Sequence, residues 1–373
     1  MSTVHRASDL PYYDVDRFTL FDLEMVRLIL RGGSILDWHR LNLGPTDDVQ
    51  AICTSLGIDL DDPDDAAMVE RIRDEAVAYL RETFDFPIPA PVARASLPDL
   101  LRLAASTDNR HRQLCACTLL KTMHVINHFD ASEARQALEL TDQELFRMAE
   151  QRIYRVVSRM MAEQLPVVEF MGGRKQRGSM VTKLLSKTDP LSAQLFDKMR
   201  FRVITATRDD VLPTIAFLSR NLFPFNHVLA GESYNTLLPF ISYCRQHAHL
   251  AGLVEQLQID PGIEDRLNPM TNRHSSPSYR VVHWVADMPL PLGDSRGAFR
   301  TDGLNPVPRP LIYVRAELQI LDRKTHRRNE GGDASHRRYK SRQRAAVEDR
   351  LKLGARGVLS RAMEDDDSSD LVY

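Results

Sequence analysis

Two lysines and a serine recur at intervals of four in the segment GGRKQRGSMVTK, residues 172–183. If this segment is helical, Lys175, Ser179 and Lys183 lie on one face, because residues four apart are neighbours on a helix surface. Two ammonium groups with a hydroxyl between them suit a polyphosphate, and Arg174 adds a guanidinium donor beside them. Taken alone, the segment can also be interpreted as the solvated basic start of a helix.

Two carboxylates stand at or within strand-like segments. Asp197 precedes an alternating segment that contains Arg202, which places the aspartate at the rim of a predicted sheet. A carboxylate there suits Mg²⁺, and a surface Asp–Arg pair is the alternative. Glu317 and Gln319 share one face of the strand predicted over residues 311–321, because side chains alternate along a strand. A glutamate on an apolar strand costs free energy unless it binds a metal or activates a nucleophile.

A third group of candidate residues contains aromatic and basic side chains. Tyr279 and His283 share one face of a third predicted strand. A phenol ring and an imidazole on one face can stack on a base and hydrogen-bond to it, whereas a core aromatic with a satisfied histidine is the alternative. Glu330 stands six residues before His336, and Lys340 follows four residues later.

Together and in this order, these segments resemble the synthetase domain of RelA/SpoT homologues, the alarmone pyrophosphokinases. The family pattern is Lys-x₃-Ser-x₃-Lys, Asp-x₄-Arg, Tyr-x₃-His, Glu-x-Gln and Glu-x₅-His-x₂-Tyr-Lys. This chain matches it over roughly residues 150–350 with Lys175/Ser179/Lys183, Asp197/Arg202, Tyr279/His283, Glu317/Gln319 and Glu330/His336/Tyr339/Lys340.

The resemblance implies a role for each matching residue. Asp197 and Glu317 would bind Mg²⁺ as the cofactor, and Glu317 would also act as general base toward the attacking hydroxyl. The residues implied to bind ATP are Arg174, Lys175, Ser179, Lys183 and Arg202. The residues implied to bind the acceptor are Arg273, Tyr279, His283 and Gln319. The residues implied to support the site are Glu330, His336 and Lys340.

The reaction that the resemblance implies is transfer of the β,γ-pyrophosphate of ATP to a ribose hydroxyl of a guanine or adenine nucleotide, with release of AMP. Catalysis then consists of charge neutralisation and positioning, which Mg²⁺ and clustered cations supply. The chain departs from the family near the acceptor, with Val281 where the family has a serine and Leu321 where it has an arginine. The identity of the acceptor therefore stays open.

Two other functions are compatible with the same residues. A toxin-like relative would pyrophosphorylate the 3′ end of tRNA, and residues 322–356 carry twelve Lys/Arg against five Asp/Glu, enough for phosphate contacts. A catalytically degenerate module would sense nucleotides or bind a partner. The presence of both Asp197 and Glu317 argues against that function, because binding alone does not need both carboxylates.

The elements that must position these residues differ between the two halves of the chain. Alternating strand-like and helical segments predict an α+β domain over 166–356, a mixed sheet flanked by helices, with a helical insertion over about 231–266. The resemblance implies that this sheet is nucleotidyltransferase-like. The predicted strands are 166–171, 200–206, 279–286 and 311–321, and the predicted helices are 179–186, 208–222 and 336–353. Residues 1–165 are predicted to be all-helical, with helices over 64–84, over about 110–128 and from Thr141, whose capping box pairs it with Glu144. Residues 357–373 are predicted to form an acidic, disordered tail.

Composition limits the remaining possibilities. The chain has 373 residues, 43% of them hydrophobic, with a net charge of −2, which predicts an ordinary packed core. No apolar run approaches the roughly 20 residues that a membrane span requires, so we expect a cytoplasmic protein with reduced thiols and no membrane partner. Cys115 and Cys117 are expected to be buried, and His111, His124 and His128 to be structural or surface histidines. The expected partners are ATP and a nucleotide acceptor, with tRNA and an antitoxin or regulatory protein as alternatives.

Overall fold

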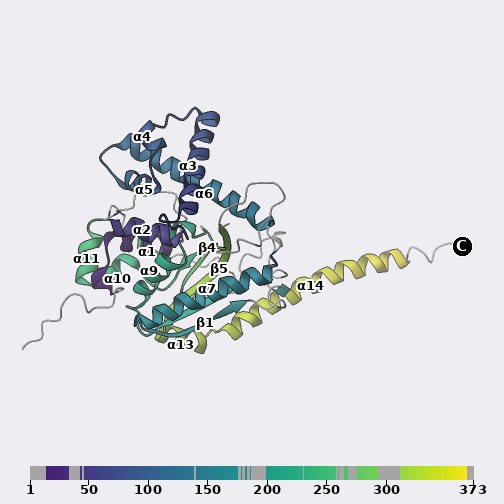
Figure 1. The fold of residues 1–373 in the computed structure, drawn as a ribbon. Helices are drawn as coiled ribbons and strands as arrows, with labels where there is room; N and C mark the ends of the chain where they lie inside the picture. Colours follow the sequence, from purple (N-terminus) through teal and green to yellow (C-terminus); the bar gives the residue numbers. More distant parts are fainter. Residues whose placement is uncertain are drawn as a thin grey trace, which may run out of the picture.

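The computed structural model describes residues 14–32, 43, 46–137, 140–174, 178, 181, 182, 185, 199–229, 231–257, 259, 264–267, 275–292 and 311–367. The side chains of residues 46–48, 174 and 352–367 are not among those described. Within these limits, no helix combines the length and apolar character needed to cross a bilayer. The fold is α+β, a five-stranded mixed sheet with helices around it and a helical N-terminal region, as the sequence predicts (Figure 1).

The elements follow one another in this order: η1 (Val15–Arg17), α1 (Leu20–Arg31), α2 (Thr46–Ser55), α3 (Pro63–Phe84), α4 (Ala90–Ala93), α5 (Leu97–Ala105), α6 (Arg110–Ala137), α7 (Asp142–Ala162), β1 (Val167–Arg174), β2 (Met199–Thr205), α9 (Val211–Asn221), η3 (Phe225–His227), β3 (Tyr234–Asn235), α10 (Phe240–Cys244), α11 (Ala248–Val254), β4 (Val282–Pro291), β5 (Leu311–Asp322), α13 (Arg323–Gly331) and α14 (His336–Asp367).

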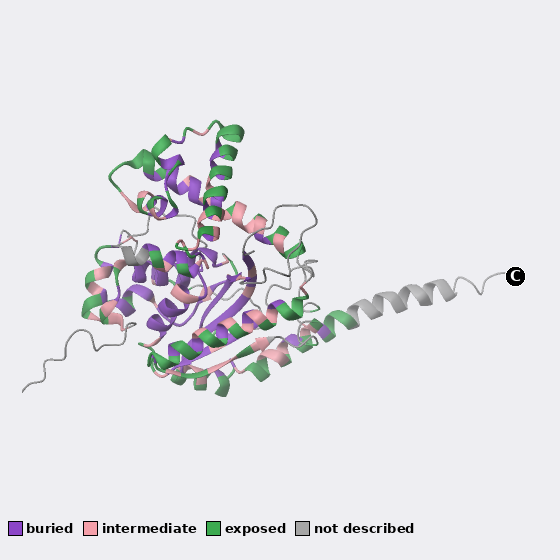
Figure 2. Cartoon of the chain, viewed as in Figure 1, coloured by how far each residue is buried: buried purple, intermediate pink, exposed green. Residues whose placement is uncertain are grey.

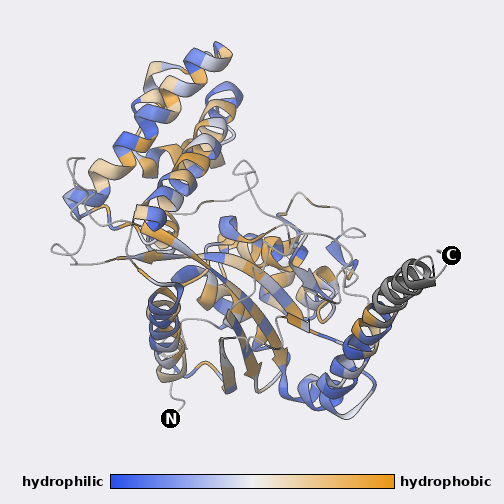
Figure 3. Ribbon diagram, turned by 90° about the vertical axis from the view of Figure 1, so that its right-hand side faces the viewer, coloured by the Kyte–Doolittle hydropathy of each residue, from blue (hydrophilic) through white to orange (hydrophobic). Residues whose placement is uncertain are grey.

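The sheet has the strand order β1-β2-β5-β4-β3. The pair β2 and β5 is parallel, and every other neighbouring pair is antiparallel. The central strand β5 is buried along almost its whole length, which matches its near-continuous apolar sequence. Helices α7 and α9 pack against β5, and α13 packs against β5 and β2. Strands β2, β4 and β5 therefore contribute to the buried centre of the molecule, whereas β1 is an exposed to half-buried edge strand (Figures 2 and 3).

The helical N-terminal region is continuous with the sheet layer. Helix α1 contacts α9, β3 and β4, helix α2 contacts α9, and helix α6 contacts β5. One hydrophobic cluster includes side chains from α1 through β5. Helices α3, α5 and α6 pack on one another and project from the body of the molecule, as Figures 1 and 3 show.

Local signals determine where several helices begin and end. The side chain of Thr141 accepts from the backbone N–H of Glu144 while the Glu144 carboxylate accepts from Thr141, so the predicted capping box is confirmed. Helix α1 begins with a similar box and ends at Gly32, whose φ is 66°. A Cβ at this glycine would lie 2.3 Å from the carbonyl oxygen of Ser233, so both conformation and space require glycine there.

Three differences from the sequence-based expectations concern the second half. Strand β4 begins at Val282, so Tyr279 lies in the turn before the strand, where its N–H donates to the carbonyl of Ser276. The segment 231–266, expected to hold one helix, contains α10 and α11. Helix α14 continues through residues 357–367, where the sequence predicts disorder, because a helix that starts earlier is extended at little cost.

A buried ion network fastens α1 to the region after α11. The Arg27 side chain, 2% exposed, donates to Glu24 at 2.7 Å and to Glu264 at 2.9 Å. Arg31 also donates to Glu264, at 2.7 Å. Because Arg27 and its partners Glu24 and Glu264 are all buried, each charge depends on a neighbour of opposite sign to offset the cost of its burial.

We expect Glu264→Gln to lower the free energy of unfolding by about 3 kcal/mol, because it leaves Arg27 buried with less compensating charge. Chemical denaturation measures the change. The matched control is Asp130→Asn, which removes a carboxylate that pairs with Arg71 at the surface, at 2.5 Å, and should cost less than about 1 kcal/mol. Equal effects of the two substitutions would contradict a stabilising role for the buried network.

Candidate active site

Strand register gathers five polar side chains on one face of the sheet. Glu317 pairs with Arg200 of β2, and Gln319 pairs with Arg202 of β2 on one side and with His283 of β4 on the other. Because side chains alternate, these residues project to the same face of three adjacent strands. The predicted common face of Glu317 and Gln319 is confirmed by a hydrogen bond of 3.0 Å from the Gln319 amide to Glu317 Oε1.

Glu317 is a buried carboxylate surrounded by nitrogen atoms. Its residue is 2% exposed, and Oε1 lies 2.7 Å from Arg200 Nε, 3.0 Å from His283 Nε2 and 3.0 Å from Gln319 Nε2. Such contacts offset the cost of burying a charge, because hydrogen bonds to an ionised group are stronger than neutral ones. The carboxylate is therefore held in one place from three directions.

A second set of contacts is centred on Arg202. Its guanidinium donates to Gln319 Oε1 at 2.9 and 3.1 Å, to Glu330 of α13 at 3.2 Å and to the Tyr279 hydroxyl at 3.4 Å. Although Tyr279 precedes β4, its hydroxyl also lies 3.5 Å from Gln319 Oε1. The Tyr279 turn, α13 and the two central strands thus meet at one guanidinium.

Helix α14 adds positive charge to the same face. Partial desolvation lowers the pKa of His336 from its ordinary value of 6.5, and the charges of Lys340 and Arg200 lower it further, against the opposing effect of Glu330. Desolvation also lowers the pKa of Lys340, again with a contribution from Arg200. These mutual effects arise because several cations share a small region, which is an environment that attracts a polyanion.

The edge of the site is formed by Tyr234. This residue of β3 pairs with His283, and the two rings stack with centroids 4.3 Å apart and planes 13° apart. Burial is the main cause that raises the pKa of the Tyr234 phenol, so the ring stays neutral at physiological pH. The stack fixes the imidazole whose other contact is Glu317.

Comparison with known proteins gives a match at the level of solved structures. The chain is similar to small alarmone synthetases. Against small alarmone synthetase 1 from Bacillus subtilis, the identity is 16%, the match covers 65% of this chain and 96% of that one, and the TM-score is 0.27. Small alarmone synthetase 2 from the same organism is 14% identical, and the match covers 58% of this chain and 91% of that one with a TM-score of 0.26. A GTP pyrophosphokinase family protein from Streptococcus pneumoniae is 14% identical, and the match covers 61% of this chain and 94% of that one with a TM-score of 0.24.

No model of a protein family matches the chain, and neither does any curated protein. At such low identities and TM-scores, the similar structures do not establish the activity of this chain. The chemistry has to be judged from its own site.

The structure brings together most of the acceptor-side and supporting residues named from the sequence. Eight of the named residues contact each other or shift each other's pKa at this face: Tyr279, His283, Gln319, Glu317, Arg202, Glu330, His336 and Lys340. Other named residues lie outside the described part of the chain: Lys175, Ser179, Lys183, Asp197 and Arg273. Arg174 ends β1 opposite Met199, and its side chain is not described.

Two residues of the site were missed by sequence reasoning. Arg200 stands two positions before Arg202, so the alternation of the predicted strand already placed both on one face. Tyr234 gave no comparable signal, because β3 has two residues and too little sequence for a periodic pattern. Its position next to His283 depends on strand pairing.

If this site binds ATP, as the family resemblance implies, His336 should make the affinity depend on pH. The pKa of His336 is lowered in the free protein, and bound phosphates would raise it, so binding takes up a proton between the two pKa values. Affinity should then fall by up to about tenfold as the pH rises from below 6.5 to above it, beyond the change due to ATP itself. Isothermal titration calorimetry across this range measures it.

The comparison of wild type with His336→Gln isolates this contribution, since ATP titrates identically in both. His111→Gln, at an exposed position of α6, should keep the full pH dependence. Superimposable pH profiles for wild type and His336→Gln would rule out a contact between this imidazole and the phosphates.

Proposed function

We propose that the chain is an ATP-dependent pyrophosphokinase that transfers the β,γ-pyrophosphate of ATP to a ribose hydroxyl of a guanine or adenine nucleotide. The observation that carries the proposal is the buried Glu317 carboxylate, held by Arg200, His283 and Gln319 on a face lined by cations. A fixed carboxylate next to concentrated positive charge suits the transfer of a highly anionic group to a hydroxyl. The family resemblance of the motifs points to the same reaction.

Glu317 fits a divalent cation in its donor chemistry, since Mg²⁺ prefers carboxylate oxygens. The Arg200 side chain on Oε1 is 37% exposed, whereas that of Glu317 is 3% exposed. Arg200 can therefore turn outward when a metal or phosphate binds, while the carboxylate stays in place. Mg²⁺, held by Glu317 together with Asp197, would supply charge neutralisation at the transferred phosphates.

The chain's own residues would act in sequence. Arg202 and Lys340 would attract the phosphates of ATP, while Tyr279 and His283 would orient the acceptor. The acceptor hydroxyl attacks the β-phosphorus, the bond from that phosphorus to the oxygen bridging it to the α-phosphate breaks, and AMP leaves. Glu317 receives the hydroxyl proton. Positioning dominates this chemistry, because the transition state of phosphoryl transfer is loose and bonding to the nucleophile is slight.

Incubation of the purified chain and Mg²⁺ with γ-³²P-ATP tests the proposal, with GDP, GTP, ADP, ATP and bulk tRNA supplied separately. Label on a mononucleotide supports the proposed reaction and identifies the acceptor. No label on any of these acceptors, with an Asp197→Ala protein equally silent, would favour the degenerate sensor or a requirement for a partner protein.

We expect Glu317→Gln to reduce transfer by about 10²–10⁴-fold, because the amide can neither accept the hydroxyl proton nor bind Mg²⁺ with a charge. The rate of label transfer under saturating ATP measures the loss. The matched control is Glu169→Gln, an exposed glutamate on strand β1, which should keep the wild-type rate. Unfolding curves of both variants separate a catalytic effect from a folding defect, and an unchanged rate for Glu317→Gln would reject the role of this carboxylate.

A second candidate is pyrophosphate transfer to the 3′ end of tRNA. Six cationic side chains on two helices beside the site are exposed: Arg323, Lys324, Arg327 and Arg328 of α13, and Arg337 and Arg338 at the start of α14. Both helices reach the site through Glu330 and Lys340. Exposed cations beside the site could bind an RNA backbone. Label on tRNA with none on the mononucleotides would favour this candidate.

A further inference from the structure

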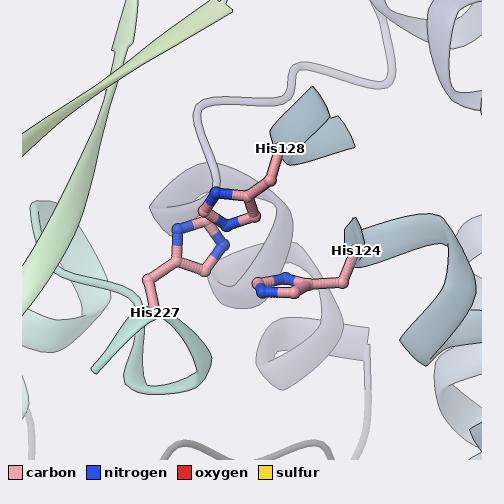
Figure 4. Close-up of side chains that lie close together, drawn as sticks. All are labelled: His124, His128 and His227. Atoms are coloured by element: carbon pink, nitrogen blue, oxygen red, sulfur yellow. The ribbon is translucent and has the colours of Figure 1, made fainter. Parts of the chain in front are cut away.

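Three histidines from distant parts of the chain converge away from the candidate active site. His124 and His128 lie one turn apart on α6, and His227 ends η3. One nitrogen from each ring falls within 4.8 Å of the others, and Figure 4 shows the three imidazoles gathered around a common space. From the sequence, His124 and His128 are expected to be structural or surface residues, because no adjacent His-Asp pair accompanies them and lone histidines rarely mark metal sites.

We propose that His124, His128 and His227 form a zinc site that joins helix α6 to η3, which packs on strand β4 of the five-stranded sheet. Neutral imidazoles are ligands for Zn²⁺, whereas Mg²⁺ takes oxygen ligands. Three protein nitrogens leave the fourth tetrahedral position for water, and Zn–N bonds of about 2.0–2.1 Å place ligand atoms roughly 3.3 Å apart. Small rotations of the rings would close the present spacing to this value.

The protonation of His227 is determined by its surroundings. Its Nδ1 lies 3.2 Å from the backbone carbonyl of Asp287, which can only accept, so Nδ1 carries the proton. Nε2 is then left with a lone pair, and it is buried without a hydrogen-bond partner. A backbone carbonyl behind the non-coordinating nitrogen is the usual way in which a protein orients a metal-binding histidine.

The rest of the cluster carries further unsatisfied atoms. His128 Nε2 and Asn226 Oδ1 are also buried without partners. Buried polar atoms are normally hydrogen-bonded, so their concentration here indicates a missing ligand. A cavity of about 60 Å³ touches His124, Asn226 and His227, among others.

The electrostatics favour the neutral form of the ligands. Burial lowers the pKa of His124 to about 4, helped by His128, and lowers the pKa of His128 and His227 as well. The charged groups that face the cluster are Asp287, which raises the pKa of His124 and His128, and Arg315, which lowers that of His128 and is bound to Asp287 at 2.7 Å. Lone pairs are therefore available at neutral pH.

The histidine cluster packs on β5, the strand that also carries Glu317 of the candidate active site. His128 stacks on Tyr313 of β5, with centroids 4.2 Å apart, and Asn127 donates to the Tyr313 hydroxyl at 2.7 Å. Tyr313 and Glu317 are four residues apart on one face of β5, which corresponds to about 13 Å along the strand. Zinc would join α6 to η3, next to the contacts that α6 makes with Tyr313 of the strand that carries Glu317.

Metal analysis of the full chain, purified without a histidine tag, tests the proposal. We expect about one Zn²⁺ per chain, lost on treatment with a chelator and restored by added Zn²⁺. The metal-free protein should melt at a lower temperature, and Zn²⁺ in about tenfold excess should raise the Tm by several degrees, because a ligand that binds the native state stabilises it. Co²⁺ should give the visible absorption of a tetrahedral site with nitrogen ligands.

Separate His227→Gln and His124→Gln variants should lose the bound zinc, the Tm shift and the Co²⁺ spectrum. His124 is half-buried, so its substitution is tolerated even if that of the buried His227 prevents folding. The matched control is His247→Gln, which removes a half-buried imidazole that contacts the Tyr243 ring at a tilt of 45° outside the cluster and should behave as wild type. The proposal is overturned if the wild type neither retains nor responds to Zn²⁺ or Co²⁺, if Mg²⁺ gives the same shift, or if His124→Gln binds metal as wild type does.

Discussion

The position of Glu317 in the middle of the sheet is the constraint on which the site depends. A carboxylate that is 2% exposed needs partners, and they come from β2, from β4 and from its own strand. These partners meet it only if β2 pairs in parallel with β5 and β4 pairs antiparallel in the observed registers. A slip of one residue in β5 would turn Glu317 to the opposite face and leave Arg200 and His283 without it.

Around this carboxylate the chain accumulates positive charge. Arg202 ties the two central strands to α13, and Lys340 brings α14 to the same face. The pKa values of His336 and Lys340 are lowered mainly by desolvation, and the neighbouring positive charges lower them further. The positive charges repel one another in the free protein, and a bound anion would relieve this repulsion. The same arrangement therefore favours the binding of a polyanion.

The helical N-terminal region is structurally coupled to the sheet. Helices α1 and α2 pack on α9, and a buried ion network links α1 to Glu264. Helix α6 contacts the beginning of β5 through Asn127 and His128, and the proposed zinc site would also join α6 to η3. The helical region is therefore in direct contact with the strand that carries Glu317.

The sequence by itself determined what depends on neighbours along the chain. The alternation around Glu317 and Gln319, the capping box at Thr141 and the apolar strands of a mixed sheet follow from local periodicity, and each is present in the structure. Tertiary structure alone decided which elements meet. Strand pairing set Tyr234 against His283, and packing brought His227 to the two histidines of α6. Neither contact leaves a periodic trace, because both join segments that are far apart in sequence and whose approach is fixed by register and by the shared core.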